Sequence, residues 1–403
     1  MTRSTGPSVA IAHDYLTQRG GAERVVLAMA RAFPGARIYT TLYEPELTYP
    51  EFADLDIVVT PLNRVALLRR HHRLALPLLA PVSSRVEIEE DVVVVSSSGW
   101  AHGFRARGPK LVYCHSPARW LYLTPEYVGT GRRGRLKSAV ATALRGPLER
   151  WDRQAAMEAD RYLANSTVIR QRIADVYGID AAVLPPPHGV SPEGGREELP
   201  GITRWAPDGY HLVVSRLLPY KNVDQVIDAF RTLPDERLLI VGAGPLRDEL
   251  AASAPRNVRF LQDLTDPQLR WVYAGATALI APSREDFGLT PLEAGAFGKP
   301  VLALRAGGYL DTVREGRTGL FFDAAVPDDI RAAVLASREQ DWDTDLIEAH
   351  VQTFAEPRFR ALLRDAVADL LPVHLQVAFR NRWHDSTTYA KEEPDDHRGA
   401  QLT

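Results

Sequence analysis

Two glutamates eight residues apart mark the segment of the chain that is richest in chemistry. The run APSREDFGLTPLEAGAFGKPVLA, residues 281–303, has the pattern of a buried strand, a polar loop and a helix that begins near Pro291. Glu285 lies in the loop and Glu293 in the helix, with a flexible glycine between them. Ligands of parallel α/β sheets bind where strands end, and a helix N-terminus favours phosphate. The segment therefore predicts a binding site for a phosphorylated ligand.

The second glutamate also fits a purely structural interpretation. Thr290-Pro-Leu-Glu293 has the spacing of a capping box, with proline in the first helical turn. In that interpretation Glu293 stabilises the start of the helix and binds no ligand. The neighbouring carboxylate and glycine at the end of a strand favour the binding site.

Two cations follow another predicted strand, in VVSRLLPYKNVDQVIDAF. Arg216 and Lys221 come after a strand that ends at Ser215 and before a helix that Asn222 could cap. An arginine fork and a lysine point charge together suit a diphosphate, and both can stabilise negative charge that develops on a leaving group. Two solvated loop cations would give the same pattern.

Two weaker patterns lie in the first half of the chain. Gly20 and Gly21, in HDYLTQRGGAERVVLAMA, open a predicted helix whose first N–H groups could approach phosphate oxygens. His115, in KLVYCHSPARWLY, follows a predicted strand. A histidine at such a position can bind a ligand, and it can equally be structural.

The elements that must position these residues alternate along both halves of the chain. Short β-branched runs such as SVAIAH, DVVVVSS and KLVYCHS alternate with helical patterns, and the alternation restarts after a Pro- and Gly-rich stretch at 184–209. Such alternation is typical of parallel strands with crossover helices. A length of 403 residues also exceeds one ordinary core. We therefore predict an α/β protein with two Rossmann-like domains, whose parallel sheets face a central cleft.

The same pattern predicts the domain boundaries. The last part of the chain is polar and low in apolar residues, so we expect no structure there. The expected parts are an N-terminal domain at 1–185, a linker at 186–209, a C-terminal domain at 210–355, a helix at 356–372 that packs back on the N-terminal domain, and a polar tail at 373–403.

Composition excludes several classes of protein. The formal net charge is −3, which does not fit a general nucleic-acid binder. No apolar run approaches the ~20 residues that span a bilayer, and the N-terminus has no signal-peptide pattern. Cys114 is the single cysteine, so no intramolecular disulfide can form. We expect a cytoplasmic protein without a nucleic-acid partner.

Two segments, 62–85 and 131–150, mix basic residues with leucine, alanine and valine at roughly helical spacing. Helices of this composition can lie on an anionic membrane surface. The alternative is a helix face with its charged ends in water. The first interpretation would place the protein on the inner face of the membrane as a peripheral protein.

Together these segments resemble the family-4 glycosyltransferases, retaining nucleotide-sugar enzymes of GT-B architecture, from Val9 to about Leu371. The LPPPHGV linker and the CHSPARWLY segment are similar to those of mannosyltransferases and related enzymes that build surface polysaccharides. The family's motifs match Gly20-Gly21, His115, Arg216, Lys221, the run LIVGAGPLRDEL with Gly242, Glu285, and Glu293.

The resemblance implies a role for each matching residue. Glu293 would hold the ribose hydroxyls, Glu285 would lie near the donor sugar, and His115 would contact the sugar or the acceptor. The implied catalytic residues are His115, Glu285, Arg216 and Lys221, and the implied donor-binding residues are Gly20, Gly21, Arg216, Lys221, Gly242, Phe287, Gly288, Leu289, Thr290 and Glu293.

The expected function is the transfer of a hexose from a nucleotide diphosphate sugar to a glycan or a lipid-linked acceptor, with GDP-mannose favoured as the donor. We expect no metal and no cofactor, because two cations and helix N-termini can hold the diphosphate. The resemblance implies retention of anomeric configuration. The donor nucleotide and sugar, the acceptor, the linkage and the oligomeric state stay open.

Rival functions fit the sequence less well. Position 247 is Arg where a dinucleotide fingerprint needs its third glycine. The Asp-x-Asp pairs at 54–56 and 341–345, which a metal-dependent transferase would use, lie far from the donor motifs. A nucleotide-sugar epimerase of the same two-domain fold is the main alternative.

Overall fold

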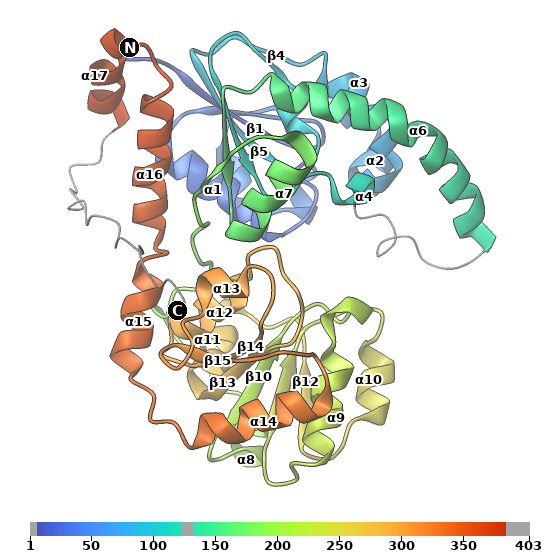
Figure 1. Ribbon diagram of the computed structural model, residues 1–403, viewed down its shortest axis with the longest axis vertical. Helices are drawn as coiled ribbons and strands as arrows, with labels where there is room; N and C mark the ends of the chain where they lie inside the picture. The colour runs from blue at the N-terminus through green and yellow to red at the C-terminus, as the bar shows by residue number, and fades with distance from the viewer. Residues whose placement is uncertain (1–5, 123–131, 384–403) are drawn as a thin grey trace, which may run out of the picture.

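The structure, a computed structural model, describes residues 6–122 and 132–383, which form two α/β domains that lie one above the other in Figure 1. The N-terminal domain has a seven-stranded sheet of order β3-β2-β1-β5-β7-β8-β9, and every pairing in it is parallel. Strands β1, β5 and β7 are buried along their whole length, as expected for apolar strands covered on both faces. The strands are Val9–His13 (β1), Arg37–Thr40 (β2), Ile57–Val59 (β3), Val92–Ser97 (β5), Lys110–Cys114 (β7), Arg161–Ala164 (β8) and Ala182–Val183 (β9).

Helices cover both faces of this sheet. Residues of α1 belong to one apolar cluster, with β1 and β5, and residues of α7 belong to the cluster on the other face. A small parallel pair, β4 (Glu87–Ile88) and β6 (Arg105–Ala106), lies beside it. The helices are α1 (Gly21–Ala32), α2 (Ala66–Arg70), α3 (Leu76–Ser83), α4 (Arg119–Tyr122), α6 (Arg132–Met157) and α7 (Thr167–Tyr177).

The C-terminal domain repeats the arrangement with six parallel strands, in the order β12-β11-β10-β13-β14-β15. The strands are Tyr210–Val214 (β10), Leu238–Val241 (β11), Val258–Leu261 (β12), Ala276–Ala281 (β13), Val301–Leu304 (β14) and Gly319–Phe322 (β15). The helices are α8 (Pro200–Trp205), α9 (Val223–Arg231), α10 (Arg247–Ser253), α11 (Asp266–Gly275), α12 (Leu289–Gly295), α13 (Tyr309–Thr312) and α14 (Pro327–Arg338). The prediction of two parallel-sheet α/β domains is confirmed. Helix α8 falls inside the stretch expected to be only a linker, because Ile202 and Ala206 pack into the core of this domain.

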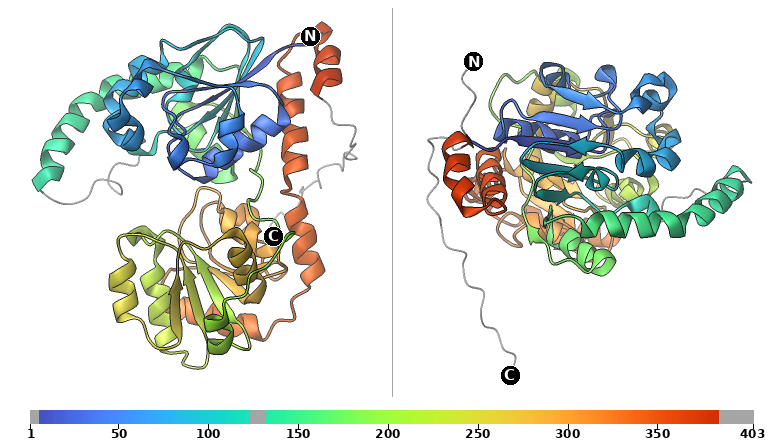
Figure 2. Two further views of the ribbon diagram at one scale, coloured as in Figure 1. Left: turned by 180° about the vertical axis from the view of Figure 1, so that it is seen from behind. Right: turned by 90° about the horizontal axis from the view of Figure 1, so that it is seen from above.

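Three helices end the described chain, and the last two of them pack on the N-terminal domain. Helix α15 (Thr344–Gln352) lies on the C-terminal domain, and α16 (Glu356–Ala368) lies along the N-terminal domain, as the left view of Figure 2 shows. Phe359 and Leu363 of α16 are buried in the same apolar cluster as α1.

The expectation that the chain has no structure beyond residue 372 is wrong for 373–383. These residues form helix α17 (Val373–Trp383). Phe379 and Trp383 are four residues apart and therefore share one helical face, and both rings pack against Phe33. These two aromatic side chains anchor the helix together with Arg380, which pairs with Asp365, and Arg382, which donates to the backbone oxygen of Gly6. The rest of the expected tail, 384–403, lies outside the described residues.

Among the helices of residues 6–122 and 132–383, none combines the length and the apolar composition that crossing a bilayer requires.

Candidate active site

Loops that follow strands in both sheets meet between the two domains. Ser166, just after β8, donates a hydrogen bond to the backbone oxygen of Asp286, which follows β13, at 2.5 Å. At the start of α1, a Cβ on Gly21 would lie 3.3 Å from the Leu289 side chain of the C-terminal domain. The carboxyl ends of the two parallel sheets therefore meet at the domain boundary, and ligands of such sheets bind at those ends.

Lys221 and Glu285 come together at this edge. Lys221 Nζ forms an ion pair with Glu285 Oε1, and Ser283 Oγ donates to the same oxygen at 2.5 Å. Asn222 holds the loop in place, since its Nδ2 donates to the backbone oxygen of Pro282 at 3.0 Å. The prediction that Asn222 caps helix α9 is wrong: its backbone is left-handed, with φ 53°, and its side chain makes no cap hydrogen bond. The amide instead joins the loops after β10 and β13.

Arg216 lies in the same loop as Lys221 and is exposed, with Nη2 3.3 Å from the Tyr220 hydroxyl. Gly242 follows β11 and packs against this loop. A Cβ on Gly242 would lie 1.8 Å from the backbone oxygen of Ser215, so the close approach of the two loops requires glycine there. The glycine turn thus supports the loop that carries both cations.

Glu293 is buried and is not a helix cap. Helix α12 begins at Leu289, two residues before the expected start, and its N-cap residue Gly288 has φ 85° and no side-chain cap bond. The capping interpretation is therefore wrong. The Tyr273 hydroxyl donates to Glu293 Oε2 at 2.7 Å, and Arg24 of the N-terminal domain lies 3.9 Å from Oε1. Burial, followed by the Glu293 charge, raises the pKa of Tyr273 well above its ordinary range, so it stays a donor.

The residues between the two glutamates have different surroundings. Phe287 is buried in the apolar core of the C-terminal domain, so only its backbone could reach a ligand. Gly288 lies against Tyr309, whose ring a Cβ would meet at 2.4 Å. Leu289 and Thr290 are half-buried in the first turn of α12. Their backbone N–H groups are among the first of that helix.

On the other side of the boundary, Gly20 and Gly21 start helix α1 as predicted. Glu23, in the first turn, is buried, and its Oε2 would lie 2.5 Å from a Cβ on Gly20. Gln18 Nε2 donates to Glu23 Oε1 at 2.9 Å. The glycine pair thus permits both the close packing of Glu23 and the approach of Leu289.

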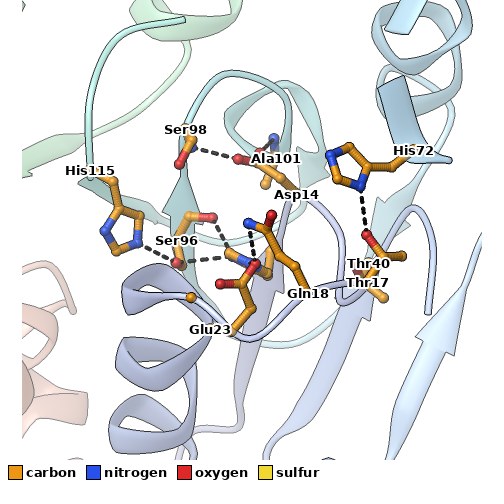
Figure 3. Close-up of polar contacts among 12 residues, drawn as sticks. Asp14, Thr17, Gln18, Glu23, Thr40, His72, Ser96, Ser98, Ala101 and His115 are labelled. Carbon is orange, nitrogen blue, oxygen red and sulfur yellow. Dashed lines mark hydrogen bonds and ion pairs between the residues drawn. The ribbon is translucent and has the colours of Figure 1, made fainter. Parts of the chain in front are cut away.

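His115 follows β7 and is connected to Ser96 (Figure 3) and through Ser96 to His13, two residues that no sequence motif indicated. Its Nε2 lies 2.8 Å from Ser96 Oγ, and His13 Nδ1 lies 3.0 Å from the same oxygen. Burial, followed by His13 and Arg119, lowers the pKa of His115 to about 3, so the ring is neutral at neutral pH. Both missed residues lie at the carboxyl ends of strands, His13 at the end of β1 and Ser96 near the end of β5, and those positions were the available clue.

Asp14, another missed residue, fixes the loop after β5. Its carboxylate accepts backbone hydrogen bonds from Ser98 at 2.5 Å, from Trp100 at 2.9 Å and from Ala101 at 2.6 Å. A buried carboxylate with this many donors is a structural anchor. It sets the position of the strand end that carries Ser96.

Asp286 joins the domains and was also missed. Its carboxylate pairs with Arg119 and accepts a hydrogen bond from Arg172 Nη1 at 3.0 Å, both from the N-terminal domain. Beside it, Thr167 Oγ1 donates to Asp311 Oδ1 at 2.6 Å. Asp286, the residue after Glu285, therefore links the two domains.

The first basic segment, 62–85, forms several short helices rather than one amphipathic helix. Arg69 pairs with Glu44 at 3.0 Å, and His72 Nδ1 lies 3.0 Å from Thr17 Oγ1, so part of the basic run is structural. Of the second segment, 131–150, residue 131 and the side chains of 132–144 lie outside the described residues. The exposed side chains of the first segment include Arg64, Leu67, Arg70, Leu74, Leu78 and Arg85.

Within residues 6–122 and 132–383, no group of three or more His, Cys, Asp or Glu side chains is placed to hold a metal ion.

Curated relatives of the chain are enzymes that transfer sugars. The chain is 37% identical over 195 residues to the D-inositol 3-phosphate glycosyltransferase of Actinosynnema mirum, an alignment that covers 42% of this chain and 46% of that one. It is 32% identical over 215 residues to the GDP-mannose-dependent alpha-(1-6)-phosphatidylinositol monomannoside mannosyltransferase of Mycolicibacterium smegmatis, over 45% of this chain and 54% of that one. The chain thus spans about half the length of these relatives.

Solved structures share the fold over a larger part of the chain. Anabaena HepE in complex with UDP has a TM-score of 0.65 at 16% identity, over 90% of this chain and 100% of that one. The apo lipopolysaccharide outer core galactosyltransferase WaaB has a TM-score of 0.60 at 18% identity, over the same 90% and 100%. These neighbours have the GT-B fold.

Two family models match successive parts of the chain and together cover most of it. Residues 19–193 match the model described as Glycosyltransferase Family 4, and residues 196–344 match the model described as Glycosyl transferases group 1. The protein therefore belongs to the family-4 glycosyltransferases of group 1 and has their GT-B fold.

Proposed function

We propose that the protein transfers a hexose from a nucleotide diphosphate sugar to a glycan or lipid-linked acceptor, with retention of anomeric configuration and without a metal ion. The observation that carries this proposal is the Lys221–Glu285 pair at the carboxyl edge of the C-terminal sheet. His115 lies across from it: Asn165 donates to the backbone oxygen of His115 at 3.1 Å, and its neighbour Ser166 contacts Asp286. These contacts connect the segment of His115 to the loop that carries Glu285, the partner of Lys221, which supports a shared site for the three side chains.

The cations would stabilise the leaving group. Arg216 is exposed in its loop and Lys221 stands beside it, so a diphosphate could be held by a guanidinium fork and an ammonium group. Negative charge grows on the diphosphate as the bond from the sugar to its oxygen breaks, and fixed cations at that position lower the barrier. In the same proposal, Glu293 accepts hydrogen bonds from the ribose, and Glu285 contacts the donor sugar.

GDP-mannose is the donor that we propose. The name of the Mycolicibacterium relative specifies GDP-mannose, and the match to it is 32% identical over 45% of this chain. The Anabaena neighbour was solved with UDP, at 16% identity. We give the closer sequence match more weight, because the fold alone does not set the donor.

A lipid-linked acceptor is supported by one surface of the N-terminal domain. Leu67 and Leu74 are more than half exposed, at 58% and 56%, and Leu78 is 46% exposed. Three exposed arginines, Arg64, Arg70 and Arg85, lie in the same segment. Leucines of this kind can enter a membrane interface, and each basic residue adds about 1 kcal/mol near an anionic surface. We propose that this surface holds the enzyme on the inner face of the membrane.

A transfer assay tests the proposal. Purified protein with excess EDTA is offered GDP-mannose, UDP-glucose and other nucleotide sugars, with and without lipid-linked acceptors, and NMR gives the anomeric configuration of the product. We expect transfer from GDP-mannose with retention and without added metal. Conversion of the nucleotide sugar when no acceptor is present would indicate an epimerase. Loss of transfer in EDTA that manganese restores would refute metal independence.

Sedimentation with vesicles tests the membrane surface. We expect binding that rises with anionic lipid, falls with salt and is lost in the Arg64/Arg70/Arg85→Glu variant. The matched control reverses charge on three exposed arginines of the C-terminal domain, Arg204, Arg231 and Arg338, and should still sediment. Absence of binding at low salt would favour a soluble acceptor.

A further inference from the structure

The imidazole of His115 is the end of a buried chain of polar groups. Its Nε2 lies 2.8 Å from Ser96 Oγ, at the end of β5. Ser96 is fully buried, and its backbone oxygen and Oγ both lie 3.0 Å from Nδ1 of His13 on β1. The three side chains come from the neighbouring strands β1 and β5 and from the residue that follows β7.

The hydrogen-bonding capacity of each atom decides where the protons lie. A backbone oxygen only accepts, so His13 Nδ1 carries a hydrogen and donates to the Ser96 carbonyl and hydroxyl oxygens. The Ser96 hydroxyl cannot then donate to His13. Its one other neighbour among these contacts is His115 Nε2, and a buried hydroxyl rarely leaves its hydrogen unused. Ser96 therefore donates to Nε2 of His115.

Glu23, at the other end of this series of buried polar side chains, holds His13 in this orientation. His13 Nε2 faces Glu23 Oε1 at 3.9 Å, and both side chains are buried. Gln18 Nε2 donates to the same carboxylate oxygen at 2.9 Å. Although burial by itself lowers the pKa of His13, Glu23 and Asp14 raise it above its ordinary value. The carboxylate thus opposes a flip of the His13 ring that would turn Nδ1 away from Ser96.

We infer that Ser96 and His13 are positioning residues that hold His115 in the Nδ1–H tautomer, so that its ring presents a hydrogen-bond donor to the ligand. The inference builds on the proposed function, in which His115 contacts the sugar or the acceptor. A neutral imidazole whose Nε2 accepts from Ser96 carries its one hydrogen on Nδ1. His115 is only partly buried, and no hydrogen bond from its Nδ1 to another residue is present in the described part of the chain.

The tautomer limits what His115 can do in the reaction. Nε2 already accepts the hydrogen bond from Ser96, and the protonated Nδ1 has no lone pair available for a further proton. Neither nitrogen can therefore take a proton from an acceptor hydroxyl. His115 instead donates a hydrogen bond to an oxygen of the donor sugar or of the acceptor and so orients that group for the transfer. The acceptor proton must leave by another route.

NMR of protein with ¹⁵N-labelled histidine tests the tautomer directly and needs no activity. Long-range ¹H–¹⁵N spectra at neutral pH distinguish a protonated ring nitrogen from an unprotonated one, and the His115→Gln variant assigns the signals. We expect Nδ1 of His115 to be protonated and Nε2 unprotonated in the wild-type protein. Protonation at Nε2 in the wild-type protein would overturn the inference whatever reaction the enzyme catalyses.

Two variants separate positioning from general stability. Ser96→Ala removes the donor to Nε2, so we expect His115 to shift toward the Nε2–H tautomer and kcat to fall about tenfold with little change in KM. Ser98→Ala is the same substitution two residues later. It removes a half-buried hydroxyl that takes no part in the contacts between His115, Ser96 and His13, so it should change neither the tautomer nor kcat. An unchanged His115 spectrum in Ser96→Ala would contradict the inference. If Ser96→Ala does not fold, the wild-type spectrum still decides. A protein that has the predicted tautomer but transfers no sugar would refute the proposed function alone.

Discussion

Asp286 of the C-terminal domain accepts a hydrogen bond from Arg172 of the N-terminal domain at 3.0 Å, and the preceding residue, Glu285, pairs with Lys221. Closure of the domains and the geometry of the proposed phosphate site therefore involve adjacent residues of one loop. Because Asp286 also pairs with Arg119, its carboxylate holds two arginines of the opposite domain. The contact is partly shielded from water, since the side chain of Asp286 is 15% exposed.

Loss of the charge on Asp286 should loosen this closed arrangement. We expect Asp286→Asn to widen the particle in X-ray scattering and to lower kcat/KM about tenfold, because a charge-assisted hydrogen bond between the domains is weakened. Asp323→Asn, which weakens an exposed pair with Arg305 within one domain, is the matched control and should change neither quantity. Equal scattering profiles for Asp286→Asn and the wild type would show that this contact does not hold the domains together.

The two cations should differ in their effect on stability but not on turnover. Lys221→Ala and Arg216→Ala should each lower kcat by roughly a hundredfold or more, since each removes a charge from the diphosphate. Lys221→Ala should also lower Tm, because it leaves the carboxylate of Glu285 without a cation to balance its charge, whereas Arg216 is exposed. Steady-state kinetics and thermal unfolding check both statements. Full activity in a folded variant would remove that residue from the phosphate site.

The role of Glu293 can be measured through nucleotide affinity. Glu293→Gln should weaken binding of the nucleotide diphosphate about tenfold in titration calorimetry, because a charged acceptor for the ribose hydroxyls becomes neutral. Tyr273→Phe removes the hydroxyl that donates to the same carboxylate and serves as the comparison. It should lower Tm and change affinity less. Unchanged affinity in Glu293→Gln would leave this residue with a structural role.

The low pKa of His115 predicts a dependence of stability on pH. Since folding lowers the pKa from its ordinary value of 6.5 to about 3, protonation favours the unfolded chain. Above pH 6.5 the neutral His115 ring imposes no penalty on the free energy of unfolding, and stability is lost as the pH falls from 6.5 toward 3. Between about pH 7 and about pH 4, Tm of the wild type should therefore fall more steeply than Tm of His115→Gln. The exposed His71→Gln variant should follow the wild type, and parallel curves for His115→Gln would argue against the shifted pKa.

The fold could be predicted from the sequence because the alternation of strands and helices follows from which residues are buried, and the pattern of apolar residue types shows this directly. The position of Glu293 could be found in the same way, but its environment could not. The capping interpretation failed because helix α12 begins after Gly288, whose φ is 85°. Thr290 therefore lies inside the helix and cannot be its N-cap residue. Asn222 was assigned to a cap for the same reason: local spacing does not show that an amide will bridge to another strand end.

The residues that were missed share a physical cause. Asp286, Ser96 and His13 act through contacts with residues far away in the chain, and nothing within a few positions of them indicates those partners. Helix α17 was missed because composition averages over a segment, whereas two aromatic rings on one face decide whether it packs. The pairing of distant strand ends requires the three-dimensional arrangement.

The return of α16 and α17 to the N-terminal domain has a consequence for folding during synthesis. The apolar cluster under α1 contains Phe359, Leu363, Phe379 and Trp383, all of which leave the ribosome after the whole C-terminal sheet. The N-terminal domain, although translated first, cannot close this part of its core until the other domain has been made. A nascent chain that has emerged from the ribosome as far as α15 but not α16 should therefore carry a folded C-terminal domain beside an N-terminal domain with an open apolar surface, where chaperones can bind.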